Sequence, residues 1–485
     1  MTPLPPRVLV ASFAFVAVAL IASGQSPAAS VTGGSSSGGQ PAGLVQEDQN
    51  PVPWFVWGGD LRVRNEYFDD ALTLSAASPL HAQDLFRVRA RLWGSATIVP
   101  DLSFNLRFAA EPRIWEKSAF AKQHLGTGPE GRYGILDNFN LKWTHALGLP
   151  LTITAGRQDV QFGDPSNWWL VSDGTPVDGS WTFFLDSVRA TLEATQIKTK
   201  FDLVVIDQHA RPDSWLPILG QEGTYGLAEQ NERGMILYAS NKSLPDTQVD
   251  GYFIYKKDDA VFAYSDNANI YTLGGKLTGT PWPNWRYSAE GAGQWGWKQD
   301  SSVRTPVNVG ALRRDIRALG WNAKLSYLFK DPRDNQVSLV GEYLSGDDPS
   351  TTGKDEMFDV LWGRWPRFSE LYIYTCPLES SGKVAQLNNL FRLGTNWSLV
   401  PVKGLTCSLA YNAWFAPESV PTRTLNAALF SRSGNFRGHF AQVVLRRQFN
   451  KQLSGNLIGE CLWQGDYYAR RDLLSYVRAE MQVTF

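Results

Sequence analysis

The last eleven residues, 475–485, constrain the fold more than any other stretch of this 485-residue chain. Apolar and polar side chains alternate without a break from Tyr476 to the terminal Phe485. Such period-two alternation places the two sets on opposite faces of a β-strand. A final strand that ends on an aromatic residue fits a barrel in lipid, where it must pair with the first strand and show apolar side chains to the bilayer. An ordinary amphipathic edge strand is the alternative that these residues leave open.

Composition favours a membrane barrel over other classes of protein. Charged residues make up 19% of the chain, below the roughly 25% of soluble proteins, and there are 19 Trp and 43 Gly. After the N-terminus no apolar run is long enough for a spanning helix. The net charge of −1 gives no electrostatic case for nucleic-acid binding.

The N-terminal region predicts export from the cytoplasm. Residues 1–24 have the basic start, apolar core and small-residue cleavage site of a signal peptide. Residues 25–50 are rich in Gly and Ser, which predicts a disordered linker. Residues 51–485 then form a single β-domain.

Short turns rich in Pro, Gly, Asp and Asn punctuate the β-domain. Eight of them lie at Pro100-Asp101, Gly148–Pro150, Gln196–Lys198, Pro245-Asp246, Pro281–Asn284, Asp331–Asn335, Pro401–Gly404 and Asn450–Gln452. Each interval between turns holds two alternating strands around a longer polar loop, so the chain predicts nine hairpins and 18 strands. The expected fold is therefore all-β: a transmembrane antiparallel barrel with short periplasmic turns and long extracellular loops.

Alternation alone does not separate a barrel from a soluble β-sandwich. The aromatic residues of the apolar face favour the barrel, because they gather toward strand ends as a girdle at a membrane interface would. They are Trp285, Tyr287, Trp295, Trp297, Trp397 and Trp463. A sandwich would bury such residues in its centre.

The polar face of these strands is rich in charge. Arg87, Arg89 and Arg91 occupy every second position of one strand, and Arg62 and Arg64 recur in the strand before it. The predicted lining residues are Asp60, Arg62, Arg64, Glu66, Arg87, Arg89, Arg91, Arg107, Glu111, Lys142, Arg157, Gln158, Arg189, Glu193, Lys276, Arg286, Glu290 and Arg392. A basic lining selects and guides anions. Cross-strand Arg–Glu pairs that only stiffen the wall explain the same residues equally well.

Arg157 and one long loop depart from this simple reading. Strict alternation over 151–158 turns Arg157 toward lipid and Gln158 into the lumen, so Arg157 reaches the pore only if Gly156 hosts a bulge. The long aromatic loop 349–384 either folds into the mouth as a plug or receptor surface, or caps the rim.

Several short motifs resemble the alginate-export family of bacterial outer-membrane barrels. They are GGDLRVRNEYFDD (58–70), LFRVRARLW (85–93), GRQDVQFGD (156–164), LDSVRATL (185–192), YTLGGKLTG (271–279), YLSGDD (343–348), FDVLWGRWP (358–366) and QGDYY (464–468). The last strand also resembles the terminal strand of such barrels. The resemblance implies an outer-membrane location, an 18-stranded barrel and outward passage of an anionic polyuronate.

The expected function is a passive channel for an anionic polysaccharide or a small anionic solute. Its expected partners are outer-membrane lipid, that solute and periplasmic secretion proteins. The alternatives are a general or uptake porin with structural lumenal charges, and a secreted sandwich that binds polysaccharide. None of the five His lies in a metal-ligand spacing and no catalytic motif appears, so no metal, cofactor or enzyme activity is expected, although a Ser–His pair at the rim stays open. Of three Cys, Cys407 and Cys461 fall on the apolar phase of strands, and Cys376 in a loop.

Overall fold

A computed structural model describes residues 52–117, 127–131, 134–162, 184–211, 215–216, 230–262, 265–299, 313–363, 368–379, 388–420 and 427–485. The predicted signal peptide and linker lie outside these residues. The strands are β1 (Phe55–Asp69), β2 (Ala82–Val99), β3 (Leu102–Ala110), β4 (Arg113–Lys117), β5 (Gly128–Glu130), β6 (Gly134–Trp143), β7 (Leu151–Gln158), β8 (Leu185–Ala194), β9 (Thr199–Gln208), β10 (Gln230–Asn241), β11 (Thr247–Ala260), β12 (Asn267–Trp282), β13 (Trp285–Gln299), β14 (Arg313–Leu328), β15 (Gln336–Leu344), β16 (Lys354–Asp355), β17 (Leu390–Val402), β18 (Leu405–Phe415), β19 (Phe436–Gln448), β20 (Leu453–Gln464) and β21 (Leu473–Thr484). One α-helix, α2 (Glu370–Glu379), and short 3₁₀ turns complete the described elements.

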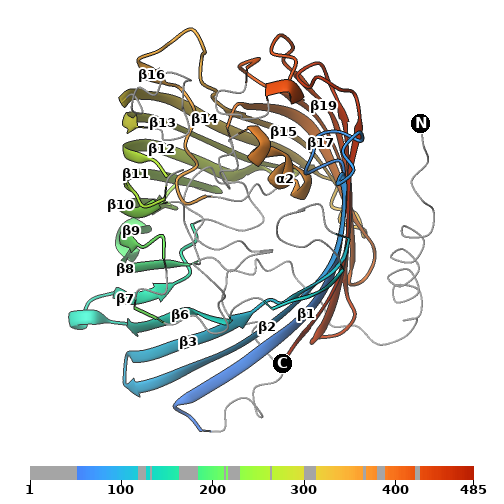
Figure 1. Cartoon of the computed structure of the whole chain (residues 1–485). Helices are drawn as coiled ribbons and strands as arrows, with labels where there is room; N and C mark the ends of the chain where they lie inside the picture. Colours follow the sequence, from blue (N-terminus) through green and yellow to red (C-terminus); the bar gives the residue numbers. More distant parts are fainter. Residues whose placement is uncertain are drawn as a thin grey trace.

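The strands form a closed antiparallel barrel of 18 strands (Figure 1). Successive strands of the wall pair with each other, which includes β3 with β6 and β15 with β17. Strands β3 and β4 pair with β2 in succession as one interrupted strand, and the short β16 pairs in parallel with β14. The first and last strands close the wall in register from Asp60 opposite Thr484 to Asp69 opposite Ser475. The prediction from the terminal strand is confirmed, and the β-sandwich alternative is wrong.

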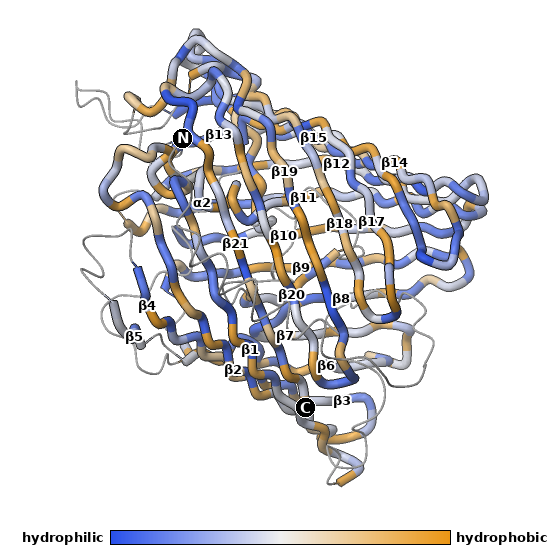
Figure 2. The backbone as a smooth tube through the Cα atoms, turned by 90° about the vertical axis from the view of Figure 1, so that its right-hand side faces the viewer, coloured by the Kyte–Doolittle hydropathy of each residue, from blue (hydrophilic) through white to orange (hydrophobic). Residues whose placement is uncertain are grey.

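All eight short turns lie where the sequence predicted them, between successive strands at one rim. These turns are compact, with two to a few residues each. In several of them a non-glycine residue adopts a positive φ, among them Asp101, Lys198 and Asp246. The long loops lie at the opposite rim. Figure 2 shows the strands inclined across the wall, as closure of a barrel requires.

The two faces of the wall follow the predicted alternation. Leu61, Leu319 and Leu339 are among the many apolar side chains that stand exposed on the outer face. Lys276 and Glu290 lie opposite each other on the inner face. Trp285 begins β13, whereas Trp295 and Trp463 lie near the other ends of their strands, as an aromatic girdle requires. The structure contains no described helix that is long and apolar enough to cross a membrane.

The long loop between β15 and β17 enters the barrel rather than capping its rim. Helix α2 lies inside the ring of strands (Figure 1). Gln294 on the inner face of β13 exchanges two hydrogen bonds with the backbone of Asp359, at 2.7 and 2.8 Å. Cys376 consequently lies in a helix, and the expectation of an irregular loop there is wrong.

Part of the inner wall is apolar, which alternation did not predict. Ile236, Ile254, Ile270 and Ile316 occupy inward positions and are almost completely buried. They belong to one cluster with Phe358, Val360, Leu361 and Trp362 of the inserted loop. The loop therefore brings its own apolar residues to cover an apolar patch of the lumen, which stabilises both.

Candidate functional site: the charged lumen

The five arginines of β1 and β2 face one another in register on the inner wall. Arg62 lies opposite Arg89, and Arg64 lies opposite Arg87. Arg91 completes the set, which we call the Arg ladder (Arg62, Arg64, Arg87, Arg89 and Arg91). Like charges directly opposite each other destabilise a sheet. The ladder therefore needs interleaved carboxylates.

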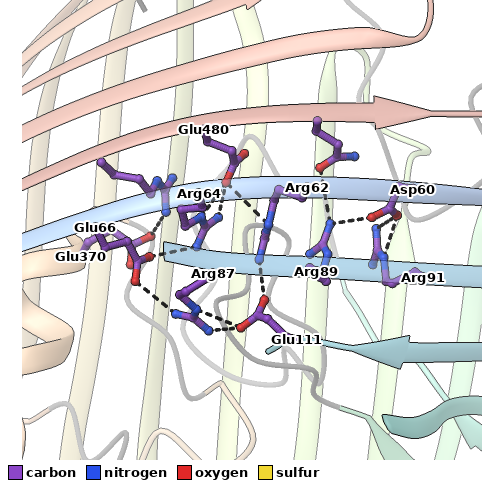
Figure 3. A network of polar contacts seen from close by, with 12 residues as sticks. Asp60, Arg62, Arg64, Glu66, Arg87, Arg89, Arg91, Glu111, Glu370 and Glu480 are labelled. Carbon is purple, nitrogen blue, oxygen red and sulfur yellow. Dashed lines mark hydrogen bonds and ion pairs between the residues drawn. The ribbon is translucent and has the colours of Figure 1, made fainter. Parts of the chain in front are cut away.

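Every arginine of the ladder has such a carboxylate (Figure 3). Arg62 contacts Glu111 at 2.8 Å, and Arg64 contacts Glu480 of the closing strand at 2.5 Å. Glu66 lies between two guanidinium groups, 3.2 Å from Arg64 and 3.3 Å from Arg87. Asp60 holds both Arg89 at 3.2 Å and Arg91 at 2.6 Å.

The network joins three strands and the inserted helix. Arg478 of β21 contacts Glu370 of α2 at 2.8 Å and lies beside Glu66 in the closing register. The side chains of Arg64 and Arg478 are 0% exposed, and even Arg91 is only 24% exposed. Six guanidinium groups thus share five carboxylates, Asp60, Glu66, Glu111, Glu370 and Glu480. A buried and nearly neutral network of this kind holds a wall together and offers little free charge to a solute.

Other predicted lining residues are also paired. Arg107 contacts Asp137 at 2.6 Å and Asp159 at 2.9 Å. Arg189 contacts Asp202, Arg392 contacts Glu342, and Lys276 lies 3.8 Å from Glu290. Glu290 also accepts a hydrogen bond from Tyr252 at 3.0 Å. The carboxylate partners Asp137, Asp159 and Asp202 were absent from the predicted lining.

Arg157 does not line the pore. Gly156 adopts a φ of 123°, yet strand pairing runs through β7 without a shift, so no bulge turns the chain. Arg157 lies opposite Phe139 and Asp186 on the outward phase, and contacts Asp186 at 2.9 Å. Gln158 does lie on the inward phase, but its amide donates to backbone carbonyls, including that of Ser187 at 3.0 Å.

A second group of basic residues behaves differently. Lys142, Lys200, Arg286, Lys324 and Arg446 all occupy inward positions within four residues of the turn-side end of a strand. We call them the turn-side bases. Four are exposed and Lys324 is half-buried. Within the described ranges none of the five forms an ion pair, and Glu193, opposite Lys200, is exposed and equally unpaired.

The structure therefore separates the predicted lining residues into two sets. Lys142, Arg286 and Glu193 are accessible at the turn side, whereas the ladder and its carboxylates are buried. The sequence prediction missed Lys200, Lys324 and Arg446 as lining residues. The sequence pattern could have identified all three, because each lies at a polar position of the alternation and close to a predicted short turn.

Both ends of α2 are fixed to the wall. Glu460 of β20 accepts the backbone N–H of Glu370 at 3.1 Å and of Leu371 at 2.7 Å, which satisfies free donors at the helix N-terminus. At the other end, Glu379 accepts hydrogen bonds from Arg437 at 2.7 Å and from Tyr467 at 3.1 Å. These contacts come from β19, β20 and the loop after β20, so the helix has a defined place in the lumen.

The start of the inserted loop is held by a buried charged cluster. Arg314 of β14 contacts Asp347 at 2.6 Å and Asp355 at 3.0 Å. Burial, with the nearby Asp355 carboxylate, raises the pKa of Asp347 to about 6, and Arg314 opposes that rise. The attachment of this loop therefore includes one carboxyl group that titrates in a mildly acidic range.

A closed barrel with an apolar outer face, an aromatic girdle and a charged lumen defines a channel of the bacterial outer membrane. The chain belongs to the alginate export family, which it matches over residues 54–478. The family resemblance and the outer-membrane location predicted from the sequence are thereby confirmed. No curated protein matches the chain by sequence.

Solved porin structures share the fold at low sequence identity. OccAB1 of Acinetobacter baumannii has a TM-score of 0.54 and 11% identity, covering 90% of this chain and 99% of that one. A BenF-like porin from Pseudomonas fluorescens Pf-5 has a TM-score of 0.53 and 10% identity, covering 88% and 98%. At such identities the likeness concerns the architecture alone.

Proposed function

We propose that this protein is a passive outer-membrane channel for an anionic polysaccharide or a comparable anionic solute. In this proposal the turn-side bases attract the anion, and the Arg ladder serves the wall. The observation that carries it is a set of five inward bases, four exposed and Lys324 half-buried, that form no ion pair among the described residues. Membership of the alginate export family adds support, because alginate is a polyuronate with a carboxylate on every sugar.

The spread of these bases suits conduction better than tight binding. They come from β6, β9, β13, β14 and β19, so they lie around the mouth instead of forming one pocket. A channel needs several weak sites, since a single strong site would retain the solute. The turn side would face the periplasm, where secretion partners would deliver a polymer bound for export.

The paired ladder supports one other function, a general porin whose lumenal charges are structural. The two functions differ in ion selectivity. A general porin with a neutralised lumen passes small cations and anions alike, whereas exposed bases favour anions. The test must therefore remove the turn-side bases and leave the ladder unchanged.

The test is reversal potential in planar bilayers under a salt gradient. The triple variant K142Q/R286Q/R446Q should shift the permeability ratio from anions toward cations and weaken current block by an oligouronate added at the turn side. K403Q/K451Q is the matched control, because both lysines lie on turns of the same rim and outside the inner wall. An unchanged ratio in a triple variant that still forms intact barrels would favour the general porin.

A further inference from the structure

A compact group of metal-ligating side chains lies where β1 ends and β2 begins, at the loop side of the barrel. His81 Nδ1 is 2.6 Å from Asp69 Oδ1 and 3.2 Å from Asp70 Oδ1. One ligand atom from each of the three residues lies within 4.8 Å of the others. The sequence did not indicate this cluster, because His81 lies eleven residues after Asp70. The fold forms it, since the β1–β2 loop brings its two ends together.

Hydrogen bonding leaves this cluster incomplete. The Nδ1 atom carries at most one proton, so it can donate to one of the two nearby carboxylates. The shorter contact is to Asp69. The side chain of Asp70 is only 8% exposed, and its Oδ1 is buried and accepts no hydrogen bond from the part of the chain that the structure describes. An acceptor in that state normally has a partner, such as a bound ion.

The backbone holds the three groups in place. The Asp70 N–H donates to the His81 carbonyl at 2.9 Å, which closes the loop at its base. The Leu74 N–H donates to the Asp70 carbonyl at 2.7 Å. A fixed loop needs little reordering to bind an ion, so its affinity loses little to conformational entropy.

We propose that Asp69, Asp70 and His81 bind a divalent transition-metal ion such as Zn²⁺. One imidazole nitrogen with two carboxylate oxygens suits a borderline metal better than calcium or magnesium, which prefer oxygen ligands alone. Binding displaces the proton between His81 and Asp69, and the metal then contacts Asp70 Oδ1 as well. Water completes the coordination.

The site would stabilise the barrel next to its closing seam. Asp69 also pairs with Ser475 of β21, and the carboxylate of Asp472, in the loop before β21, accepts the N–H of Ala76 at 3.1 Å. A metal that binds the folded barrel and has no site in the unfolded chain raises stability, by an amount that grows with the logarithm of the metal concentration above Kd. The proposed role is independent of which solute the channel passes.

The test is zinc titration of the tag-free, refolded barrel by calorimetry after removal of trace metal. We expect one zinc ion per chain to be lost in H81A, with at least a tenfold loss of affinity in D70N. H145A is the matched control, because His145 contacts a single carboxylate, Asp101, at 2.8 Å at the turn side. Zinc should raise the melting temperature of the wild type and H145A but not of D70N.

Three outcomes would overturn the proposal. They are no zinc binding by a folded wild type, the same stoichiometry in wild type and both site variants, and binding of calcium in preference to zinc. If H81A fails to fold, D70N decides alone, since it keeps the shape of the side chain while it removes the charge and one of the two ligand oxygens. Folding is checked in each case by the heat-dependent shift of the barrel on gels.

Discussion

The Arg ladder and the turn-side bases are two basic regions on the same inner face of one barrel, and they are in opposite states. The five arginines of the ladder and Arg478 share five carboxylates and are largely buried. At the turn side, five bases stand exposed or half-buried with no ion pair in the part of the chain that the structure describes. The difference shows that a residue's phase on a strand determines where it points, while its partners determine what it can do.

The largest expected effect comes from removing two arginines of the ladder. In R89Q/R91Q, the Asp60 carboxylate, whose side chain is 1% exposed, loses both guanidinium partners. Leaving a buried charge unpaired costs roughly 3–5 kcal/mol, so the denaturant midpoint of the barrel should fall sharply. The anion-to-cation permeability ratio should change much less.

Two further variants test the cause of that loss. Adding D60N to R89Q/R91Q removes the orphaned charge and should restore most of the stability. The turn-side variant K142Q/R286Q removes the same number of charges and should leave stability nearly unchanged. Equal losses in the two double variants would remove the distinction between the regions.

A smaller effect is expected when a charge is placed at Met481 or at Gln482, two adjacent positions that face lipid and the ladder respectively. Met481 lies opposite Val63 on the outer face, and Gln482 lies opposite Arg62. M481E should cost about 1–2 kcal/mol, somewhat less than an Arg at that depth. Q482E should be neutral or stabilising, because Gln482 already accepts a hydrogen bond from Arg89 at 3.4 Å and the network has one surplus positive charge. Equal unfolding midpoints would contradict the assignment of faces.

A still smaller effect should follow from converting one turn-side base into a paired one. Ser288 lies opposite Lys324, and its buried hydroxyl has no hydrogen-bond partner among the described residues. S288D should pair with Lys324, raise stability by roughly 0.2–1 kcal/mol and reduce anion preference in bilayers. S288A, which adds no charge, should do neither. An unchanged permeability ratio in S288D would show that Lys324 is not part of the selective set.

The smallest expected effect concerns the inserted loop, where the buried cluster of Arg314, Asp347 and Asp355 includes one carboxyl group with a raised pKa. Asp347 has a pKa of about 6 in the attached loop, above its ordinary value of about 3.9. A raised pKa means that attachment is strongest below pH about 4 and weakens as the pH rises through about 6. Single-channel currents should therefore fluctuate more at pH 7 than at pH 4.5. D347N should abolish the difference, and persistence of the difference would assign it to another group.

Much of the barrel could be predicted because its physics is local. Alternation, turn residues and the final Phe485 each act within a few residues, and together they determined the strand number, the closing pair and the two faces. The two Arg-rich strands were also expected to be neighbours, since they form one hairpin.

The state of the charges could not be predicted in the same way. Glu480 and Glu370 reach Arg64 and Arg478 from segments far apart in sequence, and no spacing rule relates them. Nor does any pattern in the loop 349–384 indicate that a helix forms there and enters the lumen. Arg157 was undecided from sequence because it depended on a bulge, which only backbone pairing could exclude.

The pairing of Phe485 with Gly59 has a consequence for the order of events in the cell. Phe485 and Gly59 exchange two backbone hydrogen bonds, at 3.0 and 2.8 Å, so β1 gains its second neighbour only after β21 has been synthesised. Until then β1 carries an open edge, which is a template for aggregation. Joining such distant ends costs little more entropy than joining nearer ones, because that cost grows only with the logarithm of length. Assembly of this barrel therefore requires that the open edge of β1 be protected until β21 pairs with it.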